Sequence, residues 1–426
     1  MEINTVMSRL STREGISKGE ILMQYVKTLI LGAGPVGLTV GNMLAKKNDK
    51  DFIILEAANE VGGLCKSTIV DGSAFDIGGG HFLDVRRPVV NSFLFEFMPE
   101  SEWSLFQRNS KISIHETLID HPFEANIYQL PIDVQVEYLK SIAKAGSNVG
   151  SPMPHLFKDW IRWKLGDKIA DSYMIPYNEK MFGKNLDNLG TYWMEKLPNV
   201  SFEEVLKSCL EKHAYGSQPG HAQFYYPKKF GYGELWNRMG EKIQKHIKLN
   251  SPVVQINIEQ KMVICKDGSK YKADRIITSI PWKSFQLIDA PLEVTEAVQK
   301  LQHTGIETRY FSKKLETDAH WIYYPESEKP YHRILVRHNF CTGSRGYWTE
   351  TNLDRIGMFQ SDAQYSYRIE YAYPLNTVEK PMAMEKIIRY AESNEVYPIG
   401  RWGEHQHYNS DLSVEIGMNF VETRMK

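Results

Sequence analysis

Three glycines and a glutamate near the start of the chain have the types and spacing that bind a dinucleotide. Gly32, Gly34 and Gly37 follow a short apolar run at residues 26–31, and Glu56 lies about 20 residues downstream. Glycines at such a turn let a pyrophosphate approach the backbone, and the N-terminus of a following helix offers N–H groups to the anion. The carboxylate can accept hydrogen bonds from ribose hydroxyls. We therefore expect dinucleotide binding, with Pro35, Val36 and Ala57 on the same turns.

A strand–helix–strand unit must position these residues. Residues 26–31 predict a strand, the run to Lys46 predicts a helix, and residues 51–55 predict a second strand. Residues 28–45 carry no charge over a length that could span a membrane. Gly32, Gly34 and Pro35 would break the helix that such a span needs, and no signal-peptide cleavage pattern follows. We expect a Rossmann-like domain and no membrane span.

Two further glycine clusters bear on the choice of cofactor. Gly62 and Gly63 precede Leu64 and Cys65, and a second glycine pair of this kind resembles FAD enzymes of the glutathione-reductase type, which favours FAD over NAD. Residues 78–80 are all glycine, and they place His81 at the end of a loop whose backbone can lie against a flat ligand. We expect Gly79, Gly80 and His81 to contact the cofactor; a purely structural turn is the alternative.

Composition limits the classes of partner and compartment. The chain has 51 Lys and Arg against 52 Asp and Glu, so nothing indicates a nucleic-acid or anionic-membrane surface. The four cysteines show no C-x-x-C spacing, which argues against a disulfide framework or a structural zinc site and predicts a cytoplasmic protein. His405 and His407 would face one way on a strand, but without a third ligand we expect no metal site. The number of subunits is left open.

The length of 426 residues and the changes in periodicity predict several domains in one α/β protein. After a tail at residues 1–23, we expect a discontinuous FAD-binding domain of the glutathione-reductase type at residues 24–90, 213–285 and 395–426. Residues 91–212, rich in helix formers and aromatics, predict an inserted helical domain. Residues 286–394, with several alternating strands, predict an antiparallel β-sheet substrate domain. A terminal helix is expected to begin near Ser410 or Asp411.

Six segments, in this order, resemble UDP-galactopyranose mutases: GGLCKST, FDIGGGH, IPYNEKMFGKNLDNLGTYWMEKLP, FYYPKKFGYGELW, HWIYYPESEKPYHRI and GRWGEHQHYNSD. The resemblance runs from residue 26 to about residue 416, with one extra glycine before His81. It implies an FAD-dependent mutase that interconverts the pyranose and furanose forms of a UDP-sugar through a reduced-flavin N5 sugar adduct. Its partner would be a small-molecule nucleotide sugar.

The resemblance also implies roles for individual residues. Arg333 and Lys196, which replaces the arginine of the family, would hold the substrate diphosphate, and His81 would orient the flavin or transfer protons. His407 stands where the family has tyrosine, with Tyr408 next to it. The substrate residues implied are Trp193, Lys196, Tyr323, Arg333, His407 and Tyr408. The further cofactor residues implied are Val254, Gly400, Arg401, Asp411, Leu412 and Ser413.

Two other functions fit part of the sequence. A flavin oxidoreductase of the amine oxidase or protoporphyrinogen oxidase type would share the cofactor domain and a similar insertion. Such oxidases usually have GGR where this chain has GGLCKS, and an amine or porphyrinogen would favour apolar walls over paired cations. A nucleotide-binding protein without catalysis would keep the first glycines but would have no reason to keep the GGGH loop. We therefore favour the mutase.

Overall fold

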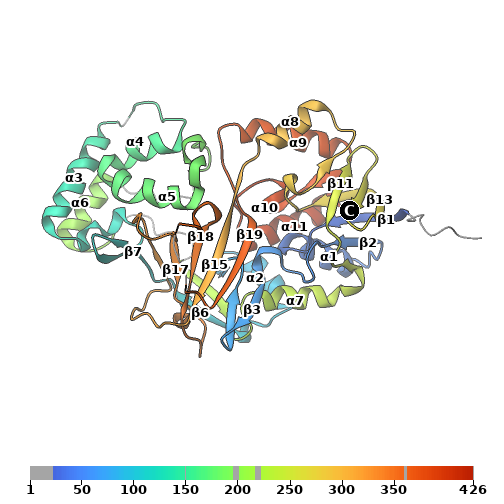
Figure 1. The fold of residues 1–426 in the computed structure, drawn as a ribbon, viewed down its shortest axis with the longest axis horizontal. Coiled ribbons are helices and arrows are strands. Elements are labelled where there is room, and N and C mark those ends of the chain that lie inside the picture. Colours follow the sequence, from blue (N-terminus) through green and yellow to red (C-terminus); the bar gives the residue numbers. More distant parts are fainter. Residues whose placement is uncertain (1–22, 149, 195–200, 216–221, 359–361, 426) are drawn as a thin grey trace, which may run out of the picture.

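The computed structural model describes residues 23–148, 150–194, 201–215, 222–358 and 362–425 (Figure 1). A sheet flanked by helices lies at one end of the molecule, a group of helices lies at the other, and a second sheet stands between them (Figure 1). The predicted class, α/β with a Rossmann-like domain, an inserted helical region and an antiparallel sheet, is confirmed.

The first sheet has eight strands, and its centre is the predicted strand–helix–strand unit. Strand β1 (Met23–Leu31) is followed by helix α1 (Pro35–Lys46) and pairs in parallel with β2 (Phe52–Leu55). The other strands are β10 (Ile247–Lys248), β11 (Val253–Asn257), β12 (Met262–Cys265), β13 (Lys270–Thr278), β14 (Gln286–Leu287) and β20 (Val396–Pro398). The close packing of β1 and α1 requires Gly37, because a Cβ there would lie 1.9 Å from the Gly32 carbonyl oxygen.

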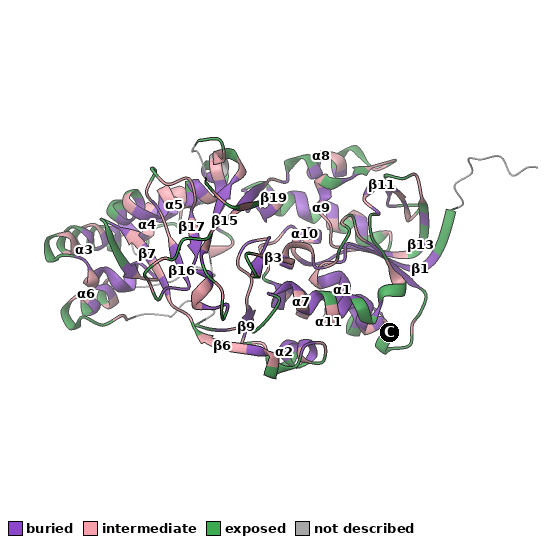
Figure 2. Ribbon diagram, turned by 60° about the horizontal axis from the view of Figure 1, so that its bottom comes forward, coloured by how far each residue is buried: buried purple, intermediate pink, exposed green. Residues whose placement is uncertain are grey.

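Helices cover both faces of this sheet, and the alternation along β1 decides which core each residue joins. Ile30 packs with α1, α7 (Gly233–Lys242) and α11 (Ser410–Arg424), whereas Leu29 and Leu31 pack with α8 (Leu292–Lys300) and α9 (Lys380–Ser393). Figure 2 shows that most of α1 and the C-terminal half of β1 are buried. Helices α8 and α9 lie near the two ends of residues 286–394, the segment expected to form the substrate sheet. That expectation was wrong at both ends, because these helices pack against the first sheet.

The second sheet has seven strands in the order β19-β15-β18-β17-β16-β7-β8, antiparallel except where β16 meets β7. Five come from the expected segment: β15 (His303–Phe311), β16 (Trp321–Tyr323), β17 (Arg333–Leu335), β18 (Tyr347–Asn352) and β19 (Tyr365–Pro374). The other two, β7 (Ser110–Ile114) and β8 (Thr117–Asp120), come from the segment expected to be helical. His115 and Glu116 both have positive φ, as a tight hairpin turn requires.

The helical region is therefore shorter than expected. It comprises α3 (Ile132–Gly146), α4 (Phe157–Ile169), α5 (Ile175–Phe182) and α6 (Phe202–Glu211), packed around one apolar core. The core that contains Ile30 also includes helix α2 (Pro88–Phe95), the hairpin of β3 (Ser67–Val70) and β4 (Ser73–Asp76), and a three-stranded sheet of β5 (Leu83–Asp84), β9 (Gln223–Pro227) and β6 (Trp103–Gln107). In the described part of the chain, no helix is long and apolar enough to cross a membrane.

Candidate functional site

A cavity of about 740 Å³ lies between the carboxyl ends of β1, β2 and β13 and the strands β16, β17 and β19. Its volume falls within the roughly 300–1,000 Å³ typical of cofactor and small-molecule sites. Residues predicted for both cofactor and substrate line it. These are Gly32, Gly34, Pro35, Val36, Glu56, Ala57, Gly63, Leu64, Cys65, Gly80, His81, Tyr323, Arg333, Arg401, His407, Tyr408 and Ser413.

The glycine turn forms one end of the cavity. Gly32 has φ +98°, and Gly34 is loosely packed, since a Cβ built there would make only an ordinary van der Waals contact, with the Gly63 Cα at 3.9 Å. Glu56 is fixed at the end of β2, where its two carboxylate oxygens accept the Ala33 N–H at 2.7 Å and the Ala58 N–H at 2.9 Å. This end offers an exposed glycine backbone, a helix start and an oriented carboxylate, as a bound dinucleotide needs.

Each glycine of the GGGH loop has a different packing reason. A Cβ on Gly78 would lie 1.8 Å from the Leu64 carbonyl oxygen, and one on Gly80 would lie 1.9 Å from Leu335 Cδ2. Gly79 has φ +90° and would bring a Cβ within 2.7 Å of the Glu350 carboxylate. All three positions must therefore be glycine for the loop to pack this closely against its neighbours.

His81 lies at the end of this loop and lines the cavity, as predicted from the sequence. Its Nδ1 is 2.9 Å from the Gly79 carbonyl oxygen. Burial lowers the pKa of His81 to about 4, so the imidazole is neutral at pH 7. The proton then sits on Nδ1 as the donor to Gly79, which leaves Nε2 as a hydrogen-bond acceptor.

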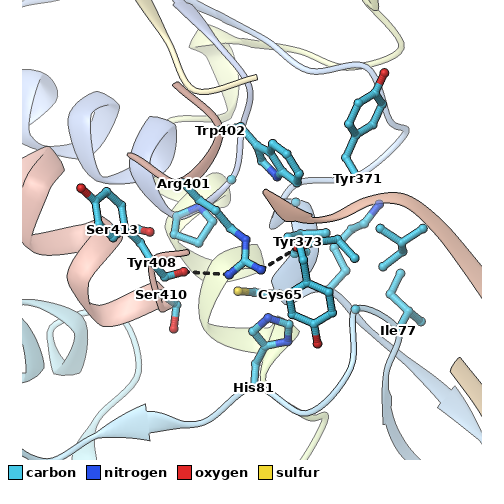
Figure 3. Close-up of a pocket in the computed structure, with 18 of the residues that line it drawn as sticks. Cys65, Ile77, His81, Tyr371, Tyr373, Arg401, Trp402, Tyr408, Ser410 and Ser413 are labelled. Atoms are coloured by element: carbon cyan, nitrogen blue, oxygen red, sulfur yellow. Dashed lines mark hydrogen bonds between the residues drawn. The ribbon is translucent and has the colours of Figure 1, made fainter. Parts of the chain in front are cut away.

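Arg401, in the short helix α10 (Gly400–Gly403), brings a cation to the middle of the cavity. Its Nη1 donates to the Tyr408 carbonyl at 2.9 Å and its Nη2 to the Ala372 carbonyl at 2.6 Å. Figure 3 shows the guanidinium between Tyr373 and Tyr408, with Cys65 and His81 beside it. Its Nε is buried without a hydrogen-bond partner, and no carboxylate pairs with it among the residues the structure describes. Burial lowers the pKa of Arg401 to about 10, so it stays charged at neutral pH.

Arg333 marks the substrate end and is paired with a buried carboxylate. It stands opposite Glu350 in the register of β17 and β18, and its Nε donates to Glu350 Oε2 at 2.8 Å. Burial alone would raise the pKa of Glu350, but Arg333 and the neighbouring His332 hold it down at about 2. The Tyr373 hydroxyl also reaches Glu350 Oε2, at 3.4 Å. Arg333 is thus held rigidly, with much of its charge balanced by Glu350.

A second cation at this end, Arg108, was not predicted. It follows β6 and lies 4.8 Å from the centroid of the Trp321 ring, while its Nη2 donates to the Tyr323 oxygen at 3.1 Å. The Trp321 Nε1–H donates to the same oxygen at 2.7 Å, so Tyr323 accepts two hydrogen bonds and keeps its own proton for a ligand. Alternating residues at positions 110–120 could have revealed the strand that follows Arg108.

Several predicted site residues lie elsewhere. Gly37, Gly62, Gly79 and Gly400 support the cavity wall without lining it, and Val253 lines the cavity in place of Val254 because the alternation along β11 turns Val254 away. Helix α11 begins at Ser410, as expected, but only Ser410 and Ser413 of its first turn line the cavity, not Leu412.

Three further residues predicted for the site are Asp411, Trp193 and Lys196. Asp411 is buried in an ion pair with Arg87 at 2.7 Å, so it does not face the cavity. Trp193 packs against Phe157 in the helical core, and its Nε1–H donates to the Gly190 carbonyl. Lys196 lies outside the described residues.

The two histidines considered for metal binding lie in the segment after α10 rather than on a strand, and they do not face the same way. His405 is buried, with Nε2 2.8 Å from the Gln302 carbonyl oxygen, whereas His407 lines the cavity beside the Tyr373 ring. Within the described ranges, no group of three or more His, Cys, Asp or Glu side chains could hold a metal ion.

Two family models match parts of the chain. The model for an NAD(P)-binding Rossmann-like domain matches residues 30–97, and that for a flavin containing amine oxidoreductase matches residues 137–311.

The fold is also similar to solved structures. A crystal structure of reduced UDP-galactopyranose mutase superposes with a TM-score of 0.85 at 21% identity, over 94% of each chain. A protein named as a protoporphyrinogen oxidase, from Exiguobacterium sp. 255-15, gives 0.67 at 15% identity over 94% of this chain and 99% of that one. Putrescine oxidase with bound putrescine gives 0.64 at 13% identity over 95% of this chain and 100% of that one. The chain therefore has the fold suspected from its sequence, which it shares with UDP-galactopyranose mutase and putrescine oxidase.

Proposed function

We propose that this protein is an FAD-dependent mutase that interconverts the pyranose and furanose forms of a UDP-sugar. The observation that carries the proposal is that one cavity joins a dinucleotide turn to a set of cations. Lys66, Arg108, Arg333, Arg368 and Arg401 line it, together with the acidic residues Glu56 and Glu370. Three of these cations are paired with carboxylates that do not line the cavity: Lys66 with Glu60, Arg333 with Glu350 and Arg368 with Glu307. Arg401 has no carboxylate partner among the described residues, so the wall offers a fixed cation and several charged donors to an anionic ligand such as a diphosphate.

The residues present fit an FAD molecule. Gly32, Gly34 and the start of α1 would hold its diphosphate, and Glu56 would accept its ribose hydroxyls. The buried Nε of Arg401, which lacks a partner, and the first turn of α11 would face the ring, where negative charge collects on reduction. Bound reduced flavin would supply an electron-rich nitrogen to the sugar.

The protein's own residues would then bind and orient the nucleotide sugar. Arg333 and Arg108 would stabilise the charge that develops on a departing diphosphate, since fixed cations at a partly buried site act most strongly where charge forms. Tyr323 would donate its free proton to a phosphate or sugar oxygen. His81 would orient the ligand through its accepting Nε2. A role for Lys196 stays part of the proposal through the resemblance alone.

The second candidate is a flavin oxidoreductase of the amine oxidase or protoporphyrinogen oxidase type. The match of residues 137–311 to the flavin containing amine oxidoreductase model supports it. The cavity supports it less, because Arg108 and Arg333 would repel a protonated amine.

A cytoplasmic location is also part of the proposal. All four cysteines are unpaired in the fold, which suits a reducing compartment.

The test is an assay of ring interconversion with the purified protein. It is incubated with UDP-galactopyranose or UDP-galactofuranose, once oxidised and once after dithionite reduction, and the products are separated by chromatography. We expect conversion only in the reduced sample, with no net consumption of electrons and no peroxide. Peroxide release with an amine or porphyrinogen, and no conversion of either UDP-sugar, would favour the second candidate.

A further inference from the structure

We propose that Glu350 is a positioning residue that fixes the substrate-side arginine and the cofactor-side glycine loop with one carboxylate. The inference rests on the proposed function, because it assigns a diphosphate to one side of Glu350 and a flavin to the other. Glu350 does not line the cavity and is fully buried, so it would act through the residues that it contacts.

The two carboxylate oxygens are used in different directions. Oε1 accepts the Gly80 N–H at 3.2 Å, and Gly80 belongs to the loop that carries His81. Oε2 accepts Arg333 Nε at 2.8 Å and the Tyr373 hydroxyl at 3.4 Å. Gly80, Arg333 and Tyr373 all line the cavity, so one buried side chain supports three points of its wall.

Packing leaves this carboxylate little freedom. A Cβ on Gly79 would approach Glu350 Oε1 to 2.7 Å, so the loop lies directly on the carboxylate. On the other side, Glu350 and Arg333 are direct cross-strand partners on β18 and β17. A shift of the loop must therefore move Glu350, and Glu350 must carry Arg333 with it, since packed interiors transmit displacement.

Two physical effects of Glu350 on anion binding have opposite signs. Its negative charge offsets that of Arg333 and should weaken the attraction of Arg333 for a diphosphate. Its hydrogen bonds hold Arg333 in one conformation and so remove the entropy that a free guanidinium would lose on binding. A charge-only role predicts tighter binding of UDP when the charge is removed, whereas a positioning role predicts weaker binding. The three geometric supports lead us to expect the second outcome.

Three variants of the flavin-loaded full-length protein test this. Glu350→Gln keeps the length but loses the charge, and Glu350→Asp keeps the charge but cannot reach both Gly80 and Arg333. Asp120→Asn is the matched control: Asp120 is a carboxylate of the same sheet, paired with its cross-strand partner Lys111, and neither residue lines the cavity. UDP affinity is measured by calorimetry, the flavin absorption bands are recorded without UDP, and circular dichroism checks folding.

We expect both Glu350 variants to bind UDP at least about tenfold more weakly, as for a coupling of moderate size between sites, and to shift the flavin bands. Asp120→Asn should change neither. Arg333→Lys, which keeps a cation at β17, serves if the Glu350 variants do not fold; it should also shift the flavin bands, through Glu350.

Two results would overturn the inference and leave the proposed function standing. One is tighter or unchanged UDP binding in Glu350→Gln. The other is unaltered flavin bands in both Glu350 variants and in Arg333→Lys. Failure of the parent protein to bind UDP at all would overturn both.

Discussion

The guanidinium carbon of Arg401 lies 5.5 Å from the centroid of the Tyr373 ring, over a side chain that also reaches Glu350. Tyr373 thus stands between the two arginines of the cavity, Arg401 beside the expected flavin and Arg333 at the expected diphosphate. Burial raises the pKa of Tyr373 to about 12, so it is a neutral spacer at working pH. The two cations can therefore serve different ligands.

Replacing Arg401 with methionine should lower the reduction potential of the bound flavin. A fixed cation near the ring favours the anionic reduced form, and losing about 1–2 kcal/mol of that interaction lowers a two-electron potential by roughly 20–40 mV. The measurement is a spectroelectrochemical titration of the holoprotein. Arg389→Met, at an exposed arginine of α9 paired with Glu385, is the control and should leave the potential unchanged. An unaltered potential with flavin still bound to Arg401→Met would contradict this role.

Replacing His81 with glutamine should reduce the loss of stability in mild acid. The folded protein holds the pKa of His81 near 4, below its ordinary value near 6.5. Between these values the unfolded chain binds a proton that the folded protein excludes, so stability falls as pH falls from 6.5 towards 4. The variant should lose less over this window, by roughly 2–3 kcal/mol.

Urea unfolding of the FAD-saturated protein at steps of pH measures this difference. Burial also lowers the pKa of His320 to about 4 and that of His405 further still, so part of the acid sensitivity should remain in the variant. An identical pH slope in parent and variant would show that His81 is not buried in its neutral form.

Replacing Arg108 with methionine should weaken UDP binding about tenfold, or roughly 1.4 kcal/mol. Methionine keeps an apolar stem against Trp321 but removes the charge and the donor to Tyr323. Calorimetric titration with UDP measures the effect. Arg162→Met on α4, whose partners are Asp167 and Asp171 at the surface, is the matched control. Equal affinity in the Arg108 variant and the parent would remove Arg108 from the site.

Replacing Gly37 with alanine should reduce both stability and FAD content. The added Cβ would meet the Gly32 carbonyl oxygen at 1.9 Å, and overpacking of this kind typically costs about 1–3 kcal/mol. Gly146→Ala in α3 is the control, because no heavy atom lies within 4 Å of its built Cβ, and its stability should stay equal or rise by up to about 1 kcal/mol. Thermal unfolding and the ratio of flavin to protein absorbance measure both effects. Parent-like values for Gly37→Ala would contradict the close packing of β1 and α1.

The parts of the fold that depend on local sequence were predictable. The structure has β1, α1 and β2 where the sequence predicted them. The turn between β1 and α1 accounts for Gly32, Gly34 and Gly37, and the end of β2 accounts for Glu56. Period-2 alternation likewise located the strands β15 to β19. These features follow from backbone geometry and burial over a few residues.

The parts that depend on contacts between distant segments were not predictable. Glu350 meets Gly80 and Arg333 only because β17 and β18 pair in one register over the glycine loop, and no single segment carries that information. Arg108 was missed because a helical reading was extended over residues 103–120, which contribute strands to two sheets. Asp411 matched a motif, yet Arg87, far away in sequence, decides where its carboxylate points.

The most direct test of the account is a crystal structure of the flavin-loaded protein soaked with UDP. We predict FAD along the cavity, its diphosphate at Gly32 and Gly34 and its ring between His81 and Arg401, with the UDP diphosphate in contact with Arg333. UDP density away from Arg333, or a cavity in which no dinucleotide lies against the glycine turn, would contradict it.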